Sequence, residues 1–184
     1  MLISKQPNIG KTTRHPLHQD LMYFPFRPAE RIACSWTSMV PVNRDNGGLV
    51  VIPGTHKGEL VQHNYPDWES EGGVNKAYYG IKNFPKDAKF IYLDMAPGDT
   101  VFFHPLLIHG SGTNKTQNYR RSISCHYASS KCQYIDPSGT HSEPLAKEIV
   151  DYAAKIFGGA DISYVDIWKI KSKLAAGQEY PDGL

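Results

Sequence analysis

Alternation of apolar and polar residues with a period of two is the dominant pattern in the middle of this chain. Residues two apart in a strand point to the same face of a sheet, so this period predicts half-buried strands. The segments with this alternation, or with short runs of β-forming residues, are 31–42, 47–54, 89–95, 100–110 and 120–129. Because they are short and separated by turn residues, we expect a mainly β protein with an antiparallel core.

Two of the intervening turns have clear residue signals. The sequence Asp45-Asn46-Gly47 tolerates positive φ and predicts a hairpin turn between 31–42 and 47–54. Proline followed by glycine at the centre of 96–99 predicts a type II turn, which needs a positive φ at its third residue.

The pattern changes after residue 140. Residues 141–159 have the residues of a helix, with Ser142 as its N-cap and Gly158-Gly159 as its stop, and 160–177 predicts a second helix. With strands to about residue 136 and helices from about 142 to 176, we expect residues 1–184 to form a single domain, a β core followed by C-terminal helices.

The segment 55–88 is long, polar and aromatic, and it has no regular period. Such a connection in a compact domain is usually functional or disordered. Two interpretations of its aromatic residues stay open, a lid over an acyl chain or a set of anchors that fix the loop to the barrel. The aromatic residues concerned are Tyr65, Trp68, Tyr78 and Tyr79.

Composition excludes several classes of function. The 184 residues have a formal net charge of +2, from 20 basic and 18 acidic residues, which gives no basis for a nucleic-acid partner. No run approaches the roughly 18 apolar residues of a membrane span, and the N-terminus lacks the apolar stretch of a secretory signal. The three cysteines have no zinc-ligand spacing and are expected to be reduced thiols. No feature identifies a protein partner.

A His-x-Asp motif, His18-Gln19-Asp20, is the first candidate metal site. Eight histidines and 18 acidic residues in 184 positions give roughly 0.8 His-x-Asp/Glu matches by chance. The chain has two, and the other, His141-Ser142-Glu143, lies at the predicted helix start, where Glu143 suits the helix dipole. The motif alone therefore decides nothing.

Its surroundings strengthen the first match. In a strand His18 and Asp20 share a face, and either His104 or His109 downstream could add a third ligand. Two histidines and one carboxylate form the facial triad of non-haem iron(II) oxygenases, which leaves coordination positions open for a co-substrate and oxygen. We assign structural roles to four other histidines, His15, His56, His63 and His126.

An arginine follows the late histidines, as a 2-oxoglutarate enzyme of this type requires. The distal carboxylate of that co-substrate needs a fixed cation, and arginine offers a planar bidentate fork. By alternation Arg120 shares a face with Ser122 and Ser124, whereas Arg121 shares one with Ile123. The polar face suits a wet barrel interior, so we choose Arg120.

Three stretches, "RHPLHQDLMYFPFRP", "NGGLVVIPGTHKG" and "GDTVFFHPLLIHGSGTNKTQNYRRSISCHYAS", resemble the phytanoyl-CoA dioxygenase family. The resemblance runs from Met1 to about Lys173 and implies a double-stranded β-helix, a jelly-roll-like fold. The family's proteins have a long N-terminal portion before this region, so the chain is expected to correspond to an N-terminally truncated form, about the C-terminal half.

The resemblance also implies roles for individual residues. Its iron ligands fall on His18, Asp20 and His109, and Asp20 argues against a related halogenase, in which that position is small. The residues implied in co-substrate binding are Arg120, Ser111, Trp36, Gln19 and Met1.

The implied reaction uses Fe(II), 2-oxoglutarate and O2, with ascorbate as a candidate reductant. It hydroxylates the 2-carbon of phytanoyl-CoA and related 3-methyl-branched acyl-CoAs in fatty acid α-oxidation. The resemblance implies that the protein is located in the peroxisome, although the C-terminus "YPDGL" is not a Ser-Lys-Leu targeting signal. The alternative is a non-catalytic β-barrel module that binds acyl-CoA, or an inactive truncated fragment.

Overall fold

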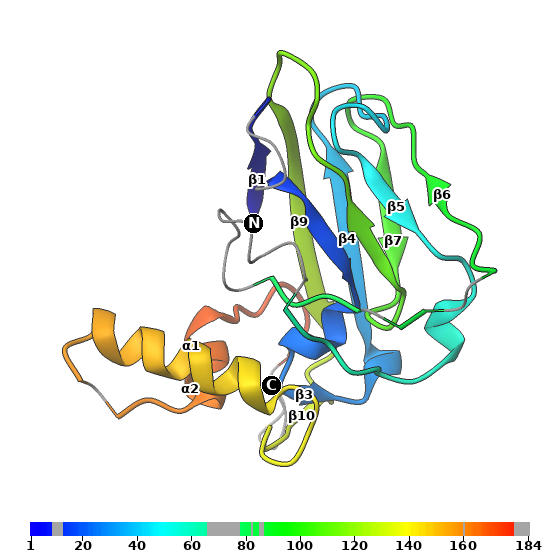
Figure 1. The fold of residues 1–184 in the computed structure, drawn as a ribbon. Helices are drawn as coiled ribbons and strands as arrows, with labels where there is room; N and C mark the ends of the chain where they lie inside the picture. Colours follow the sequence, from blue (N-terminus) through cyan, green and yellow to red (C-terminus); the bar gives the residue numbers. More distant parts are fainter. Residues whose placement is uncertain (9–12, 66–77, 82, 85–86, 160, 179–184) are drawn as a thin grey trace.

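Two four-stranded antiparallel sheets form the centre of the molecule, with the helices to one side (Figure 1). The computed structural model describes residues 1–8, 13–65, 78–81, 83–84, 87–159 and 161–178. Side chains from both sheets meet between them, where Trp36 and Val101 of the first sheet pack with Leu49 of the second. The chain is thus mainly β, as the period-two segments predict.

The first sheet has the strand order β1-β9-β4-β7. Its strands are β1 (Leu2–Lys5), β9 (Arg120–Ala128), β4 (Ile32–Ser38) and β7 (Thr100–Phe103). Along the first half of β9 burial alternates, so that Arg120 is buried, whereas Arg121 is exposed. The inward direction predicted for Arg120 is therefore observed.

The second sheet has the order β2-β8-β5-β6. Its strands are β2 (His15–His18), β8 (His109–Ser111), β5 (Leu49–Val51) and β6 (Ile91–Tyr92). In the pairing of β2 with β8, His18 and His109 are Cα partners. Gly110 makes this pairing possible, because a Cβ there would lie 2.9 Å from the His15 carbonyl oxygen and 3.0 Å from that of Pro16.

Two sequence predictions about this region are wrong. The segment 100–110 is not one strand, because β7 ends at Phe103 and the chain turns, with the Leu107 amide bonded to the His104 carbonyl at 2.9 Å, before β8 begins. The stretch 45–47 does not close a hairpin, since β4 and β5 belong to different sheets. In both places a facing-sheet fold moves the chain from one sheet to the other. Gly47 still has the positive φ expected of it, +78°.

The predicted type II turn at 96–99 is present. Gly98 has a φ of +93°, and the Asp99 amide donates to the Ala96 carbonyl at 3.1 Å.

The C-terminal segments form two helices, α1 (Glu143–Ile156) and α2 (Tyr164–Lys171). Ser142 occupies the N-cap position of α1 but its side chain makes no cap hydrogen bond, whereas Ser163 and Asp166 form a capping box on α2. Within the described residues, no helix combines the length and apolar character that crossing a membrane requires.

Helix α1 fixes the segment that follows the His-x-Asp motif. Leu145 of α1 is fully buried and packs with Met22 and Tyr79. Two short strands, β3 (Phe26–Arg27) and β10 (Gln133–Tyr134), pair beneath the sheets near the helices (Figure 1). The structure also has 3-10 helices at Asp20–Tyr23, Ala29–Arg31 and Thr55–Lys57.

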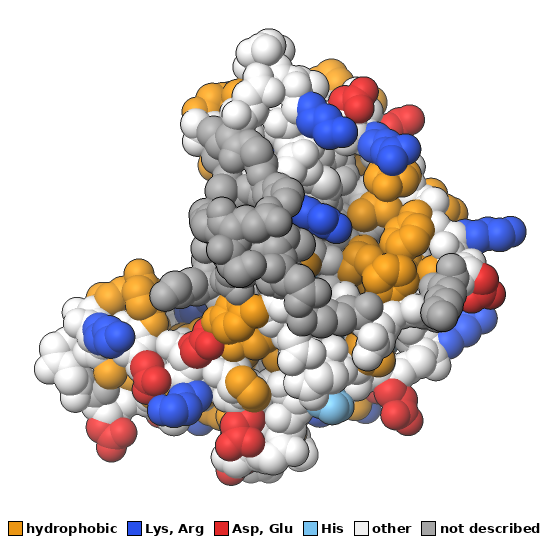
Figure 2. All heavy atoms as spheres, viewed as in Figure 1, with side chains coloured by type: hydrophobic (Ala, Val, Ile, Leu, Met, Phe, Trp, Pro, Cys, Tyr) orange, Lys and Arg blue, Asp and Glu red, His pale blue; other side chains and the backbone are white. Residues whose placement is uncertain are grey.

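One edge of the second sheet is apolar on its surface. Hydrophobic side chains gather on the part of the molecule where β5 and β6 lie (Figure 2). Around β6, Phe90, Ile91 and Tyr92 are 41%, 47% and 41% exposed.

Candidate metal site and its neighbouring cations

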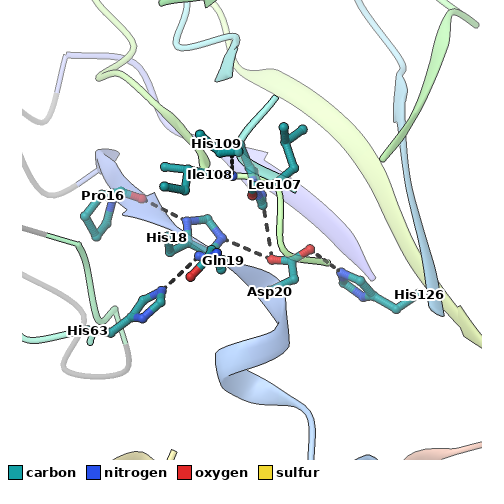
Figure 3. A network of polar contacts seen from close by, with 10 residues as sticks. Pro16, His18, Gln19, Asp20, His63, Leu107, Ile108, His109 and His126 are labelled. Carbon is teal, nitrogen blue, oxygen red and sulfur yellow. Dashed lines mark hydrogen bonds and ion pairs between the residues drawn. The ribbon is translucent and has the colours of Figure 1, made fainter. Parts of the chain in front are cut away.

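Three side chains meet where β2 pairs with β8 (Figure 3). His18 ends β2, His109 begins β8, and Asp20 opens a 3-10 helix rather than continuing the predicted strand. Gln19 between them is extended, with φ −117° and ψ 128°, which returns Asp20 to the side of His18. Asp20 Oδ1 lies 3.1 Å from His18 Nε2 and 3.6 Å from His109 Nε2.

Backbone carbonyls fix the orientation of both histidine rings. His18 Nδ1 lies 2.9 Å from the Pro16 oxygen, and His109 Nδ1 lies 2.9 Å from the Leu107 oxygen. A carbonyl oxygen only accepts, so each Nδ1 carries the proton and donates it. The Nε2 atom of each ring faces Asp20, and in a neutral ring with this tautomer Nε2 offers a lone pair, the arrangement that metal-binding histidines adopt.

The charge states of the cluster also suit metal binding. Burial alone would raise the pKa of Asp20, but the charge of His109 and hydrogen bonds from His126 and His18 hold that pKa well below its usual value. Burial, followed by the charge of His18, lowers the pKa of His109 to about 4. An ionised carboxylate and a neutral imidazole are the forms that bind metal.

The ligand atoms of this cluster suit a metal cation. When both rings are neutral, the three converging atoms, His18 Nε2, His109 Nε2 and Asp20 Oδ1, all accept and none donates, and ligand atoms of the three residues lie within 4.8 Å of one another. A set of two imidazoles and one carboxylate suits iron(II) and similar divalent ions.

A second group, Asp20, Cys34 and His126, also lies within ligand range of one point. Burial raises the pKa of the Cys34 thiol, and a thiol binds metal only when it is ionised. His126 Nε2 lies 3.0 Å from Asp20 Oδ2, at hydrogen-bond distance. The first group is therefore the better metal site, and His104 belongs to neither group.

The motif's middle residue, Gln19, fixes the ligand segment. Its side-chain amide donates to the carbonyls of Glu59 at 3.0 Å and Leu106 at 2.9 Å, and its oxygen accepts from the Val61 amide at 2.9 Å. The backbone amide of Gln19 donates to His63 Nε2 at 2.9 Å. Gln19 thus ties the ligand segment to the loop around 59–63 and to Leu106.

Arg120 is buried on the inner face of the first sheet, with 2% of its surface exposed. Its guanidinium donates to Ser122 Oγ at 2.7 Å and to the Gly47 carbonyl at 3.2 Å, and lies 5.1 Å from the ring centroid of Trp36. Its Nε is buried and has no hydrogen-bond partner among the described residues. An orphaned donor on a buried cation calls for an explanation, and an anionic ligand that binds the guanidinium would provide one.

A lysine that sequence reasoning missed lies beside this arginine. Lys5 is 6% exposed and is the Cα partner of Arg120 in the pairing of β1 with β9. Its Nζ donates to Ser111 Oγ at 2.7 Å and to the Gly112 carbonyl at 2.6 Å. Burial, followed by the charge of Arg120, lowers the pKa of Lys5 to about 7. No motif or spacing in the sequence indicates that this lysine lies beside Arg120.

The remaining predicted residues lie in different places. Met1 is 75% exposed, and its backbone pairs with that of Ser124. Of the aromatic residues in 55–88, Trp68 lies outside the described residues. Tyr65 and Tyr79 both donate to the Glu148 carboxylate of α1, Tyr79 at 2.7 Å. These contacts favour the anchoring interpretation for those two tyrosines.

Comparison with known sequences gives one consistent result. A family model described as phytanoyl-CoA dioxygenase (PhyH) matches residues 1–122. The peroxisomal phytanoyl-CoA dioxygenase of Homo sapiens is 55% identical over 180 residues, covering 97% of this chain and 53% of that protein. A probable phytanoyl-CoA dioxygenase of Caenorhabditis elegans is 52% identical, covering 97% and 59%. The chain spans about half the length of the curated relatives it matches.

Solved structures share the fold at lower identity. The non-heme monooxygenase ThoJ has a TM-score of 0.59 at 18% identity, covering 73% of this chain and 46% of that one. The epimerase SnoN, in complex with Fe3+, alpha ketoglutarate and nogalamycin RO, has a TM-score of 0.57 at 22% identity, covering 79% and 53%. These likenesses confirm the predicted jelly-roll-like fold.

Proposed function

The chain belongs to the phytanoyl-CoA dioxygenase family, and from this premise we propose that it is an Fe(II)- and 2-oxoglutarate-dependent dioxygenase. Its substrate would be phytanoyl-CoA or a related 3-methyl-branched acyl-CoA, hydroxylated at the 2-carbon in fatty acid α-oxidation. The observation that carries this proposal is the convergence of three acceptor atoms, from His18, Asp20 and His109, on one point.

These three residues would hold the iron through His18 Nε2, His109 Nε2 and Asp20 Oδ1. The carbonyls of Pro16 and Leu107 keep both imidazoles in the tautomer that binds metal. Iron(II), when bound, would supply open coordination positions at which a 2-oxo acid and O2 could react, and O2 would be the oxidant for the hydroxylation. Ascorbate is the candidate reductant.

Arg120 would hold the distal carboxylate of 2-oxoglutarate. Its buried Nε, which has no partner in the part of the chain that the structure describes, supports this role, because a bidentate carboxylate accepts from donors of that kind. Trp36 lies against the guanidinium of Arg120 and would position it. Ser111 accepts a hydrogen bond from Lys5 and would position that cation near the co-substrate. Met1 and Gln19 are carried only by the family resemblance.

The relatives' names support the substrate and the compartment. Those of Homo sapiens and Mus musculus are named peroxisomal phytanoyl-CoA dioxygenases, so we place this protein's activity on acyl-CoA in the peroxisome. We also propose that residues 1–184 form one oxygenase domain.

The test is an anaerobic titration of the protein with Fe(II) and 2-oxoglutarate, followed by the visible metal-to-ligand charge-transfer band. We expect a saturable band that disappears in Asp20→Ala and remains in Asp94→Ala, a control on an exposed carboxylate. Adding O2 and phytanoyl-CoA should then give succinate and a 2-hydroxyacyl-CoA in equal amounts.

A folded sample without a band, or a band unchanged in Asp20→Ala, would contradict the proposal. Acyl-CoA binding that is indifferent to Asp20→Ala, without succinate formation, would instead identify a non-catalytic binding module.

A further inference from the structure

The structure assigns Lys5 to the co-substrate site: we propose that it is a second cationic ligand for the distal carboxylate of 2-oxoglutarate, acting together with Arg120. The inference rests on the proposed function and deepens it, since it names a residue that contacts the co-substrate. Neither the motifs nor the spacing of the sequence point to this residue.

The first argument is that Lys5 and Arg120 are buried like charges placed directly opposite each other. They are Cα partners on β1 and β9, and they are 6% and 2% exposed. Like charges at opposed positions of a sheet destabilise it, and burial without a counter-ion adds a desolvation cost. In the described part of the chain neither cation has an ion-pair partner. An anionic ligand between them would remove this repulsion.

The second argument is the position of the two cations relative to the metal ligands. Ser111, which accepts the bond from Lys5, follows His109 by two residues on β8. The two residues therefore share a face and lie about 6.6 Å apart along the strand. A five-carbon diacid that binds an ion at His109 through its 2-oxo acid end would extend its other carboxylate over about this distance.

The third argument is that the backbone closes around the Lys5–Arg120 pair. A Cβ at Gly47 would lie 2.6 Å from Lys5 Cδ and 2.8 Å from the Gly112 carbonyl oxygen, and the Gly47 carbonyl accepts from Arg120. The chain at Gly47 thus lies against both cations, with no space for a side chain. This confinement suits a small planar carboxylate better than the bulky nucleotide phosphates of coenzyme A.

A purely structural role is the rival explanation. Lys5 could serve only to tie β1 to the end of β8 through Ser111 and Gly112. The two roles differ in one measurable respect. A structural lysine affects every ligand of the site equally, whereas a carboxylate ligand affects only compounds that have the distal carboxylate.

The experiment compares two ligands on the anaerobic Fe(II)-loaded protein by isothermal titration calorimetry. One is 2-oxoglutarate, and the other is 2-oxovalerate, which has the same 2-oxo acid end but a methyl group in place of the distal carboxylate. We expect Lys5→Met to raise the Kd of 2-oxoglutarate about tenfold or more and to leave that of 2-oxovalerate within about twofold. Lys115→Met, at an exposed lysine after β8, should change neither.

Two further variants guard against loss of the fold. Lys5→Arg keeps the charge and should recover most of the 2-oxoglutarate affinity. Lys5→Gln keeps a donor for Ser111 and Gly112 without the charge, and should show the same selective loss as Lys5→Met. Circular dichroism and the Kd for Fe(II) check that each variant retains the folded metal site.

Equal weakening of both ligands, or no change in either, would overturn the assignment of Lys5. That result is distinct from failure of the proposed function, in which the unmodified protein binds neither 2-oxo acid in the presence of Fe(II). If the unmodified protein binds both ligands equally well, the cation pair does not serve the distal carboxylate and the inference about Lys5 is wrong.

Discussion

The imidazole of His126 lies against the carboxylate of Asp20, with Nε2 3.0 Å from Oδ2. The other oxygen, Oδ1, faces His18 and His109. An ionised carboxylate only accepts, so His126 is the donor. The two oxygens of Asp20 therefore have different partners. One is available to an ion, and the other is held by a residue from β9 of the first sheet, 28% of whose side chain is exposed.

We expect His126→Ala to weaken Fe(II) binding about 10- to 100-fold, because a ligating carboxylate that loses its orienting hydrogen bond binds metal less well. His126→Gln, which keeps a donor, should lie between this variant and the unmodified protein. The Kd for Fe(II), measured anaerobically, gives the comparison, with the exposed His141→Ala as control. An Fe(II) affinity unchanged in His126→Ala would show that Asp20 is fixed by other contacts.

Acidification should destabilise the metal-free protein between pH 6.5 and 4. Burial lowers the pKa of His63 and of His109 to about 4, so over this range the unfolded chain binds protons that the folded chain does not. The stability that these neutral histidines contribute is complete above pH 6.5 and is lost as the pH falls toward 4. Each of these two histidines is expected to lower the free energy of unfolding by about 2 kcal/mol as the pH falls from 7 to 5.

Urea denaturation at pH 7, 6 and 5 in the presence of a chelator measures this effect. His63→Asn should reduce the dependence of unfolding free energy on pH. Asp20 acts at lower pH, since its depressed pKa means that its contribution is lost only below the ordinary carboxyl pKa. A stability that is constant from pH 7 to 5 would contradict the burial of these histidines.

Replacing Arg120 should separate co-substrate binding from metal binding. We expect Arg120→Ala to raise the Kd of 2-oxoglutarate by the equivalent of about 2–4 kcal/mol and to change that of Fe(II) little, because the variant loses a charge-assisted bidentate pair. Arg121→Ala is the matched control, since Arg121 is the next residue on β9 and its side chain is exposed on the other face. Equal weakening of both ligands would indicate misfolding.

Helix α1 should contribute directly to the stability of the β core. Leu145 is fully buried against Met22 and Tyr79, so Leu145→Ala is expected to lower the free energy of unfolding by about 2–5 kcal/mol. Leu174→Ala, at a residue that is 54% exposed, should change it by less than about 0.5 kcal/mol. Both are measured by urea denaturation, in which a single transition would show that helix and sheets unfold together.

Much of the fold follows from local patterns in the sequence. Period-two alternation identified β4 and β9 and the inward direction of Arg120, and the glycines at 47 and 98 have the positive φ expected. The wrong predictions concern connections whose path depends on which strands pair in a sheet. No local signal distinguishes a hairpin from a crossing between two sheets, so the prediction of a hairpin at 45–47 is wrong.

The sequence by itself determined which residue types are available for the site: the His-x-Asp motif, a later histidine and an arginine on a polar strand face. Only the tertiary structure decided how they combine. Pairing of β2 with β8 selects His109 over His104, and pairing of β1 with β9 brings Lys5 to Arg120. These contacts join residues far apart in the chain, and strand register, which fixes them, depends on the packing of the whole core rather than on any local segment.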